Sequence, residues 1–202
     1  MENFRTKIKL CGLTRTKDIF AVNEILPEFV GFVFYEKSRR YIPQENFLEL
    51  KKILSKKISA VGVFVNEKIS VVVEIAKNLD LIQLHGKEDE NYISELRNFM
   101  DKKIIQAFKI KTAADLERAE KSSADYILLD GGAGDGKIFN WQILENFNRK
   151  YFLAGGLNCE NISDALKILK PFAVDVSSGI ETNNVKDAEK MKNFVEIVRG
   201  TN

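Results

Sequence analysis

The chain has 202 residues, 45% of them hydrophobic and 30% charged, which is typical of one globular domain with a buried core. Its net charge of +2 gives no general positive field of the kind that nucleic-acid or membrane-surface binders use. No apolar run approaches the ~20 residues of a membrane span, and the polar start does not resemble a signal peptide. We therefore expect a single domain over residues 1–202, located in the cytoplasm, with no nucleic-acid or membrane partner.

Short runs of apolar, β-branched or aromatic residues recur along the whole chain. Most are continuous rather than alternating, which is typical of parallel strands covered on both faces. We predict eight strands, over residues 7–11, 29–34, 58–65, 81–84, 103–108, 126–130, 151–154 and 172–176.

Segments with helical spacing lie between these strands. In residues 44–56, for example, Phe47, Leu50 and Leu54 share one face, and Pro43 suits the first helical position. We predict helices over residues 17–26, 44–56, 67–77, 88–100, 113–121, 160–170 and 185–199, of which the Val-rich segment 67–77 has the weakest helical pattern.

This alternation of strands and helices allows two architectures, an open doubly wound sheet or a closed (β/α)8 barrel. A count of eight strands favours the barrel. Such barrels usually need about 250 residues and can be as short as about 200. We therefore predict an α/β fold with a single (β/α)8 TIM barrel of eight parallel strands, close to the minimal length and without long lids.

Polar and glycine residues follow the ends of the predicted strands, where barrels of this kind carry their active sites. The loops after the seventh and eighth strands contain Gly155 and Gly156, then Ser177, Ser178 and Gly179. Barrels commonly bind phosphate at these two loops through backbone N–H groups and a short helix N-terminus. Tight turns and helix caps would explain either loop alone. Both loops in this order favour a phosphate site, and hence a phosphorylated small molecule as substrate.

Cys11 and Asp130 end the first and sixth strands, so we expect them to face each other across the active site. Taken alone, Cys11 fits a small buried residue better than a catalytic one, and Asp130 fits a loop cap equally well. His85 and Arg40 have simpler explanations still, as a hydrogen bonder on the rim and a solvated charge. Cys159 is interpreted as structural, and both cysteines are expected to be reduced thiols.

The sequence contains no pattern for a metal or a nucleotide cofactor. One histidine and two distant cysteines do not make a zinc ligand set. The glycine-rich residues 131–137 lack the spacing of a phosphate-binding Walker loop and are predicted to form a mobile βα loop. No Gly-x-Gly-x-x-Gly follows the first strand, so a dinucleotide site is not expected either.

Short motifs at the strand ends appear in a characteristic order. They are KLCGLT at 9–14, GFVFY at 31–35 with SRRY at 38–41, VGVFVN at 61–66, QLHG at 83–86, LLD at 128–130, LAGGLN at 153–158 and VDVSSGIE at 174–181. This ordered set, which covers nearly the whole chain, resembles the phosphoribosylanthranilate isomerase family of tryptophan biosynthesis. Two positions depart from the family pattern, Asp135 and Asn140 in the loop after the sixth strand.

The resemblance implies an Amadori rearrangement of N-(5-phosphoribosyl)anthranilate to 1-(2-carboxyphenylamino)-1-deoxyribulose 5-phosphate, with no cofactor. It gives Cys11 the role of general base and Asp130 that of general acid, and it associates Arg40 with the anthranilate carboxylate. His85 is grouped with the substrate-binding residues. Asp175 is expected to contact a ribose hydroxyl, and an ion pair inside the barrel core explains it nearly as well.

The chemistry requires an acid for the ring oxygen and a base for the proton at C2′. The apolar residues before Asp130 suggest a burial that raises the pKa of its carboxyl, as an acid at neutral pH requires. Nothing in the sequence accounts for the lowered pKa that a basic Cys11 would need.

Two other functions compete with this interpretation. A related isomerase of histidine biosynthesis uses aspartates in both proton-transfer roles, so Cys11 argues against it. A non-catalytic barrel that binds a phosphorylated metabolite is the other. The sequence is compatible with a monomer or a homodimer.

Overall fold

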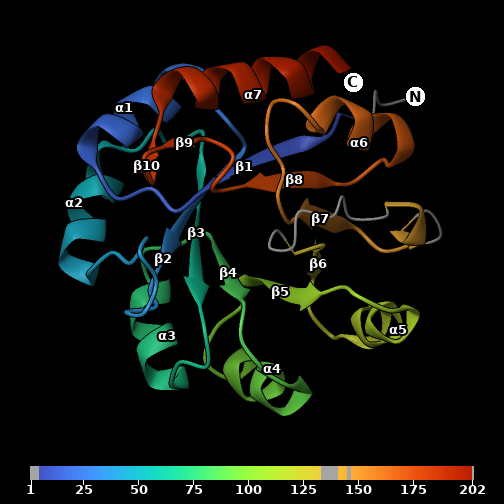
Figure 1. The fold of residues 1–202 in the computed structure, drawn as a ribbon. Helices are drawn as coiled ribbons and strands as arrows, with labels where there is room; N and C mark the ends of the chain where they lie inside the picture. The colour runs from blue at the N-terminus through green and yellow to red at the C-terminus, as the bar shows by residue number, and fades with distance from the viewer. Residues whose placement is uncertain (1–4, 133–140, 145–146, 202) are drawn as a thin grey trace.

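The computed structural model describes residues 5–132, 141–144 and 147–201. Eight parallel strands close into one barrel, in which each strand pairs with its neighbours in chain order and β8 returns to β1 (Figure 1). The prediction of an eight-stranded parallel barrel is therefore confirmed, and the open sheet is excluded. The strands are β1 Lys7–Cys11, β2 Phe29–Val33, β3 Ser59–Phe64, β4 Leu81–Leu84, β5 Lys103–Lys109, β6 Tyr126–Asp130, β7 Tyr151–Ala154 and β8 Ala173–Val176.

The helices lie outside the ring of strands (Figure 1). All seven predicted helices are present, most of them one to a few residues shorter than predicted, and a short 3-10 helix precedes β7 where none was predicted. None of the helices within the described residues has the length and apolar character of a membrane span. The helices are α1 Thr16–Ile25, α2 Gln44–Ile53, α3 Ile69–Ala76, α4 Glu90–Arg97, α5 Ala113–Lys121, α6 Ile162–Ile168, α7 Ala188–Thr201 and the 3-10 helix η1 Trp141–Leu144.

The helix predicted over residues 185–199 begins later than expected. Residues 181–186 form a small antiparallel hairpin, β9 Glu181–Thr182 and β10 Val185–Lys186, and α7 starts only at Ala188. Asn183 and Asn184 make the turn with φ angles of 52° and 62°. Asparagine tolerates this left-handed region better than most residues, and two such residues in a row suit a tight hairpin turn. The hairpin places Glu181 and Lys186 beside the barrel mouth.

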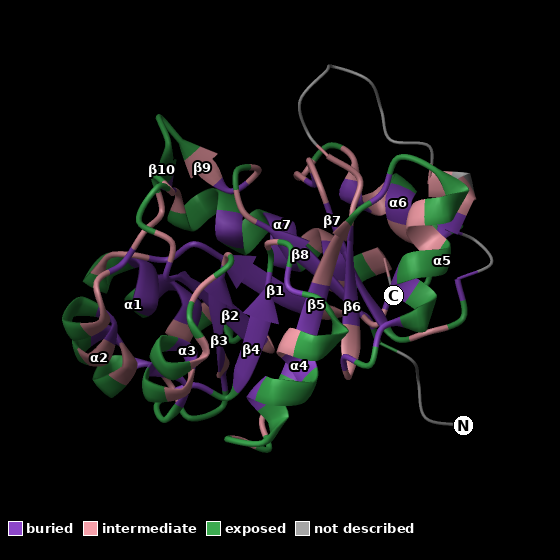
Figure 2. Cartoon of the chain, turned by 90° about the horizontal axis from the view of Figure 1, so that it is seen from below, coloured by how far each residue is buried: buried purple, intermediate pink, exposed green. Residues whose placement is uncertain are grey.

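The strands are buried on both sides, which explains why the sequence shows continuous apolar runs rather than alternation (Figure 2). Outside the strands, a large apolar cluster packs against the helices. Inside the barrel, seven strands supply a second apolar cluster, made of Phe29, Val61, Leu81, Ile105, Leu128, Phe152, Ala154 and Ala173. The remaining strand, β1, places the fully buried Lys9 in the interior.

Candidate active site

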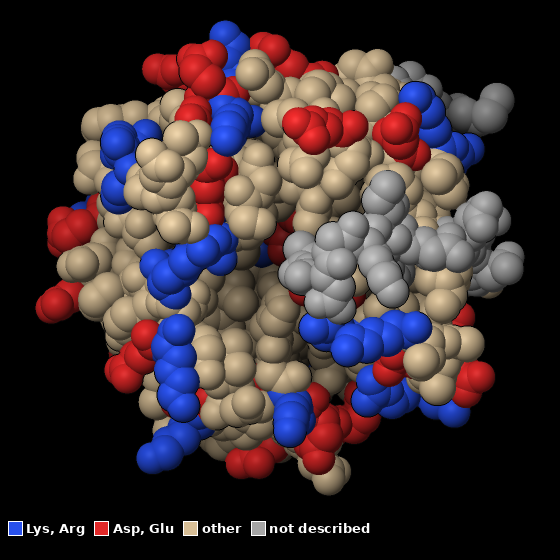
Figure 3. Space-filling model, in the orientation of Figure 1, with Lys and Arg blue, Asp and Glu red and all other residues tan. Residues whose placement is uncertain are grey.

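A cavity of about 350 Å³ opens at the carboxyl ends of the strands. Figure 3 shows a hollow near the centre of this face, with lysine and arginine side chains on part of its rim. Nine of the ten predicted site residues line the cavity: Cys11, Arg40, His85, Asp130, Gly155, Gly156, Asp175, Ser177 and Ser178. Residues from strands far apart in the sequence therefore meet at one place, as the strand-end argument predicted.

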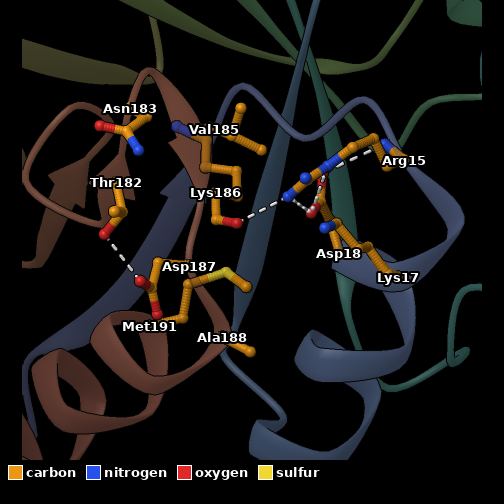
Figure 4. A pocket seen from close by; sticks show the side chains of 10 residues that line it. All are labelled: Arg15, Lys17, Asp18, Thr182, Asn183, Val185, Lys186, Asp187, Ala188 and Met191. Carbon is orange, nitrogen blue, oxygen red and sulfur yellow. Dashed lines mark hydrogen bonds and ion pairs between the residues drawn. The ribbon is translucent and has the colours of Figure 1, made fainter.

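A second cavity, of about 530 Å³, lies between α1, the β9–β10 hairpin and the start of α7 (Figure 4). Most of its charged side chains already have partners within the protein. Arg15 bonds to Asp18 and to the carbonyl of Lys186, and Thr182 donates to Asp187 at 2.7 Å. Although this cavity is larger, it lies outside the barrel and none of the predicted site residues lines it. We therefore place the active site at the barrel mouth.

Asp175 has a partner inside the barrel. Both oxygens of its carboxylate accept hydrogen bonds of 3.0 Å from the ammonium of Lys9. Burial lowers the pKa of Lys9, but Asp175 and Cys11 more than offset this effect and raise it overall. Asp175 also lines the cavity. The ion pair that was expected inside the barrel core is thus present, and Asp175 also reaches the active-site cavity.

Cys11 is only 7% exposed, at the end of β1. Burial raises the pKa of its thiol, and Lys9 opposes that rise, as does Lys186 more weakly. The hydroxyl of Ser177 donates to the carbonyl of Cys11 at 3.1 Å, which ties the end of β1 to the loop after β8. In the free protein the thiol form therefore predominates at neutral pH.

The carboxyl of Asp130 is not buried as the sequence suggested, because its side chain is 27% exposed. The strand ends there and the chain turns back at Gly132, whose N–H donates to Asp130 Oδ1 at 2.8 Å. His85 Nε2 lies 3.8 Å from Asp130 Oδ2, and Gln83 Nε2 lies 2.9 Å from His85 Nδ1. If the amide of Gln83 donates to Nδ1, the Nε2 of a neutral His85 carries the hydrogen that faces Asp130.

Gly155 makes room for Asp130. Its φ angle is +96°, and a Cβ at this position would lie 2.5 Å from Asp130 Oδ1 and 2.6 Å from the nitrogen of Gly131. Both contacts are too short for real atoms, so only glycine fits here.

We expect Gly155→Ala to lower kcat and to reduce the free energy of unfolding by on the order of 1–3 kcal/mol, the cost of a strained backbone. Fluorescence assays and urea unfolding would measure the two effects. Gly200→Ala is the matched control, because nothing lies within 4 Å of a Cβ at Gly200 in α7. It should keep full activity and gain up to about 1 kcal/mol of stability. Normal turnover in Gly155→Ala would show that Asp130 does not depend on this space.

Arg40 is held over the cavity by Glu181 of the hairpin. Its Nε donates to Glu181 Oε1 at 2.6 Å and its Nη2 donates to Oε2 at 2.8 Å. Lys186 donates to the same carboxylate at 2.6 Å. Burial raises the pKa of Glu181, but Arg40 and Lys186 outweigh it and lower the pKa to about 2. The carboxylate of Glu181 therefore stays ionised at any physiological pH.

Gly179 is the one predicted site residue that does not line the cavity. A Cβ on Gly179 would lie 2.0 Å from the carbonyl oxygen of Leu157, and Gly179 forms an isolated β-bridge with Asn158. Glycine is thus required at position 179 because the loops after β7 and β8 are in close contact there. Gly155 and Gly156, with φ angles of +96° and +70°, form the turn of the first of these loops.

Sequence reasoning missed Lys9, Glu181 and Lys186 as members of the site. Lys9 and Glu181 belong to the motifs KLCGLT and VDVSSGIE. A lysine between Ile8 and Leu10 in an apolar strand could also have indicated a buried charge. Lys186 gave no such signal, because residues 185–199 were interpreted as one helix.

Two groups of expectations concern residues 133–140, which lie outside the described part of the chain. They are the mobile loop predicted over residues 131–137, of which only Gly131 and Gly132 are described, and the departures at Asp135 and Asn140. Among the described residues, no group of three or more His, Cys, Asp or Glu side chains is arranged to hold a metal ion.

Comparisons with known proteins agree with one another. The sequence profile of the family described as N-(5'phosphoribosyl)anthranilate (PRA) isomerase matches residues 8–197. The N-(5'-phosphoribosyl)anthranilate isomerase of Thermoanaerobacter sp. (strain X514) is 45% identical, over 96% of this chain and 98% of the relative. The crystal structure of phosphoribosyl anthranilate isomerase from Thermotoga maritima has a TM-score of 0.87 at 35% identity, over 96% of this chain and 99% of the other. A structure of phosphoribosyl anthranilate isomerase in complex with reduced 1-(o-carboxyphenylamino)-1-deoxyribulose 5-phosphate has a TM-score of 0.85 at 34% identity, over the same shares.

Proposed function

Since the chain belongs to the N-(5'-phosphoribosyl)anthranilate isomerase family and is an isomerase of tryptophan biosynthesis, we propose that Cys11 is the general base and Asp130 the general acid of its reaction. The observation that carries the proposal is that both side chains line one cavity at the barrel mouth. The family assignment decides against the isomerase of histidine biosynthesis and the non-catalytic barrel.

Asp130 acts first in this mechanism. Its carboxylic acid gives a proton to the furanose ring oxygen, the bond from that oxygen to C1′ breaks, and C1′ forms a double bond to the nitrogen of the anthranilate. The product of this step is a protonated Schiff base with a free 4′-hydroxyl. The N–H of Gly132 and the nearby His85 then stabilise the carboxylate that is left on Asp130.

Cys11 acts second. Its thiolate removes the proton from C2′, and the electrons of the C–H bond neutralise the Schiff base, which leaves an enolamine. Tautomerisation of the enolamine, with a proton added at C1′, gives the ketone. The sum is an isomerisation with no net change in atoms or electrons, so the reaction needs no cofactor.

Among the remaining predicted residues, several that line the cavity are placed to bind the substrate. We assign the phosphate to Gly155, Gly156 and Ser178, and the anthranilate carboxylate to Arg40. Two N–H groups of Arg40 bond to Glu181, and the outer N–H groups of its guanidinium are still available for a second carboxylate. The relative crystallised with a reduced carboxyphenylamino-deoxyribulose phosphate supports a ligand with these two anionic ends.

One chain supplies every residue in this proposal, so the mechanism holds for a monomer or a homodimer. The enzyme from Thermotoga maritima has been described as dimeric, and monomers derived from it have been crystallised. The cytoplasmic location stays a prediction.

Arg40→Ala should raise KM by about ten- to a hundredfold, because charge-assisted hydrogen bonds contribute about 1.5–3 kcal/mol. kcat should change much less. The loss of anthranilate fluorescence during turnover measures both constants. Arg39→Ala is the matched control, since Arg39 bonds to the same Glu181 carboxylate but is half exposed and does not line the cavity. Equal KM values for the wild type and Arg40→Ala would contradict the carboxylate assignment.

A further inference from the structure

Lys9 occupies an unusual position for a lysine. It stands in the middle of β1, its side chain is 0% exposed, and it is one of the largest fully buried side chains of the barrel. A buried lysine without partners tends to lose its proton, because burial disfavours the charged form. Here the carboxylate of Asp175 on the neighbouring strand β8 compensates for burial through two bonds of 3.0 Å.

The ammonium of Lys9 lies beside the sulfur of Cys11. Lys9 and Cys11 are two residues apart on β1, so both side chains point into the barrel. Opposite Cys11 on β2 stands Gly31, and a Cβ there would lie 2.6 Å from Cys11 Sγ and 3.1 Å from Lys9 Nζ. Sulfur and ammonium thus share the space that the missing side chain of Gly31 leaves open.

An ammonium group can donate three hydrogen bonds, and Asp175 accepts two of those of Lys9. The third N–H is therefore free to face the sulfur. A positive charge next to a thiol stabilises the thiolate, which is the form that acts as a base.

Other charged groups also surround Cys11. Lys186 of the hairpin stabilises the thiolate too, but its ammonium is engaged by Glu181 at 2.6 Å and by the carbonyl of Ser177 at 2.9 Å. Asp175 opposes the thiolate, although less strongly than Lys9 supports it. Further away, the cavity is lined by Arg40, His85 and Asp130.

We propose that Lys9 is a positioning residue of the isomerase, which stabilises the thiolate of Cys11 while Asp175 keeps the ammonium of Lys9 charged and in place. This inference rests on the proposed role of Cys11 as general base. The proton of the thiol passes to solvent before the reaction, and the thiolate then takes the proton from C2′. Lys9 itself neither gives nor takes a proton and does not touch the substrate.

The test measures the ionisation of the Cys11 thiol directly and does not depend on catalytic turnover. In a Cys159→Ser background Cys11 is the only cysteine, and its rate of alkylation by iodoacetamide can be followed from neutral to alkaline pH. We expect Lys9→Met to slow alkylation about tenfold at a fixed pH below the thiol pKa, which corresponds to one pKa unit. The rising limb of the pH profile of kcat should move to higher pH by the same amount.

Lys7→Met is the matched control, because Lys7 stands on the same strand but its ammonium lies over the ring of Phe172, 4.7 Å from the centroid. It should leave the alkylation profile unchanged. If Lys9→Met does not fold, because it leaves Asp175 unpaired, Lys9→Met combined with Asp175→Asn removes both charges. Since Lys9 outweighs Asp175 at the sulfur, the double variant should also alkylate more slowly than the wild type.

An unchanged alkylation profile in a folded Lys9 variant would overturn the inference. If Cys11 were not the general base, the experiments would give a different result. In that case Cys11→Ala would keep its turnover, while removal of Lys9 would still shift the alkylation profile.

Discussion

Cys11→Ala is expected to lower kcat by about 10²–10⁴-fold, the usual contribution of a general base. The variant removes the sulfur that would take the proton from C2′, and no other described side chain of β1 lines the cavity. Because the substitution does not touch Arg40 or the loops after β7 and β8, binding of a reduced product analogue should be nearly unchanged. Stopped-flow loss of anthranilate fluorescence gives kcat, and calorimetric titration with the analogue gives Kd.

Cys159→Ala is the control for a general effect of losing a thiol. Cys159 is partly buried near α7, donates weakly to the carbonyl of Lys190 and lies outside the cavity. We expect it to keep normal kcat. If Cys11→Ala kept a kcat near that of the wild type, the role of Cys11 as base would be withdrawn.

Asp130→Asn should lower kcat by a similar factor of about 10²–10⁴. The amide has the shape of the carboxyl, and its oxygen can still accept the hydrogen bond from Gly132, so the loop after β6 should keep its conformation. What the variant loses is a proton of suitable acidity for the ring oxygen. The same fluorescence assay measures turnover, and urea unfolding checks that stability is retained.

Asp164→Asn is the matched control for the loss of one carboxylate. Asp164 lies on the surface of α6, where it pairs with the exposed Lys167. Its removal should change neither kcat nor stability by much, because surface ion pairs contribute little. Substantial turnover in Asp130→Asn would assign the acid to another group, and the neighbouring His85 would be the first to examine.

Most of the barrel could be predicted because its signals are local. Strands buried on both sides leave continuous apolar runs in the sequence, and four of the eight strands, β1, β4, β6 and β7, have the predicted bounds. The helix ends were less accurate, since fraying and capping depend on contacts that spacing does not reveal. The β9–β10 hairpin was missed because Val185 and Lys186 also suit the apolar and polar faces of a helix.

The rim residues could be predicted from their places after strand ends, but their partners could not. Glu181 and Arg40 are 141 residues apart in the sequence, and the ion pair between them depends on the hairpin that was missed. The burial expected for Asp130 failed for the opposite reason. An apolar strand buries its own residues, whereas the last side chain of β6 reaches past the end of the core into the cavity.

The pairing of β1 with β8 has a consequence for how the active site comes into being. Lys9 and Asp175 are separated by 166 positions, nearly the full length of the chain. Because the ribosome makes the N-terminus first, Lys9 of β1 is synthesised long before β8, the strand that carries Asp175. Closing so long a loop is entropically costly, so we expect the ion pair to form late in folding. A nascent chain that ends before β8 therefore has Cys11 and Lys9 but not the carboxylate of Asp175, so the active site is complete only once β8, which begins at Ala173, has been made.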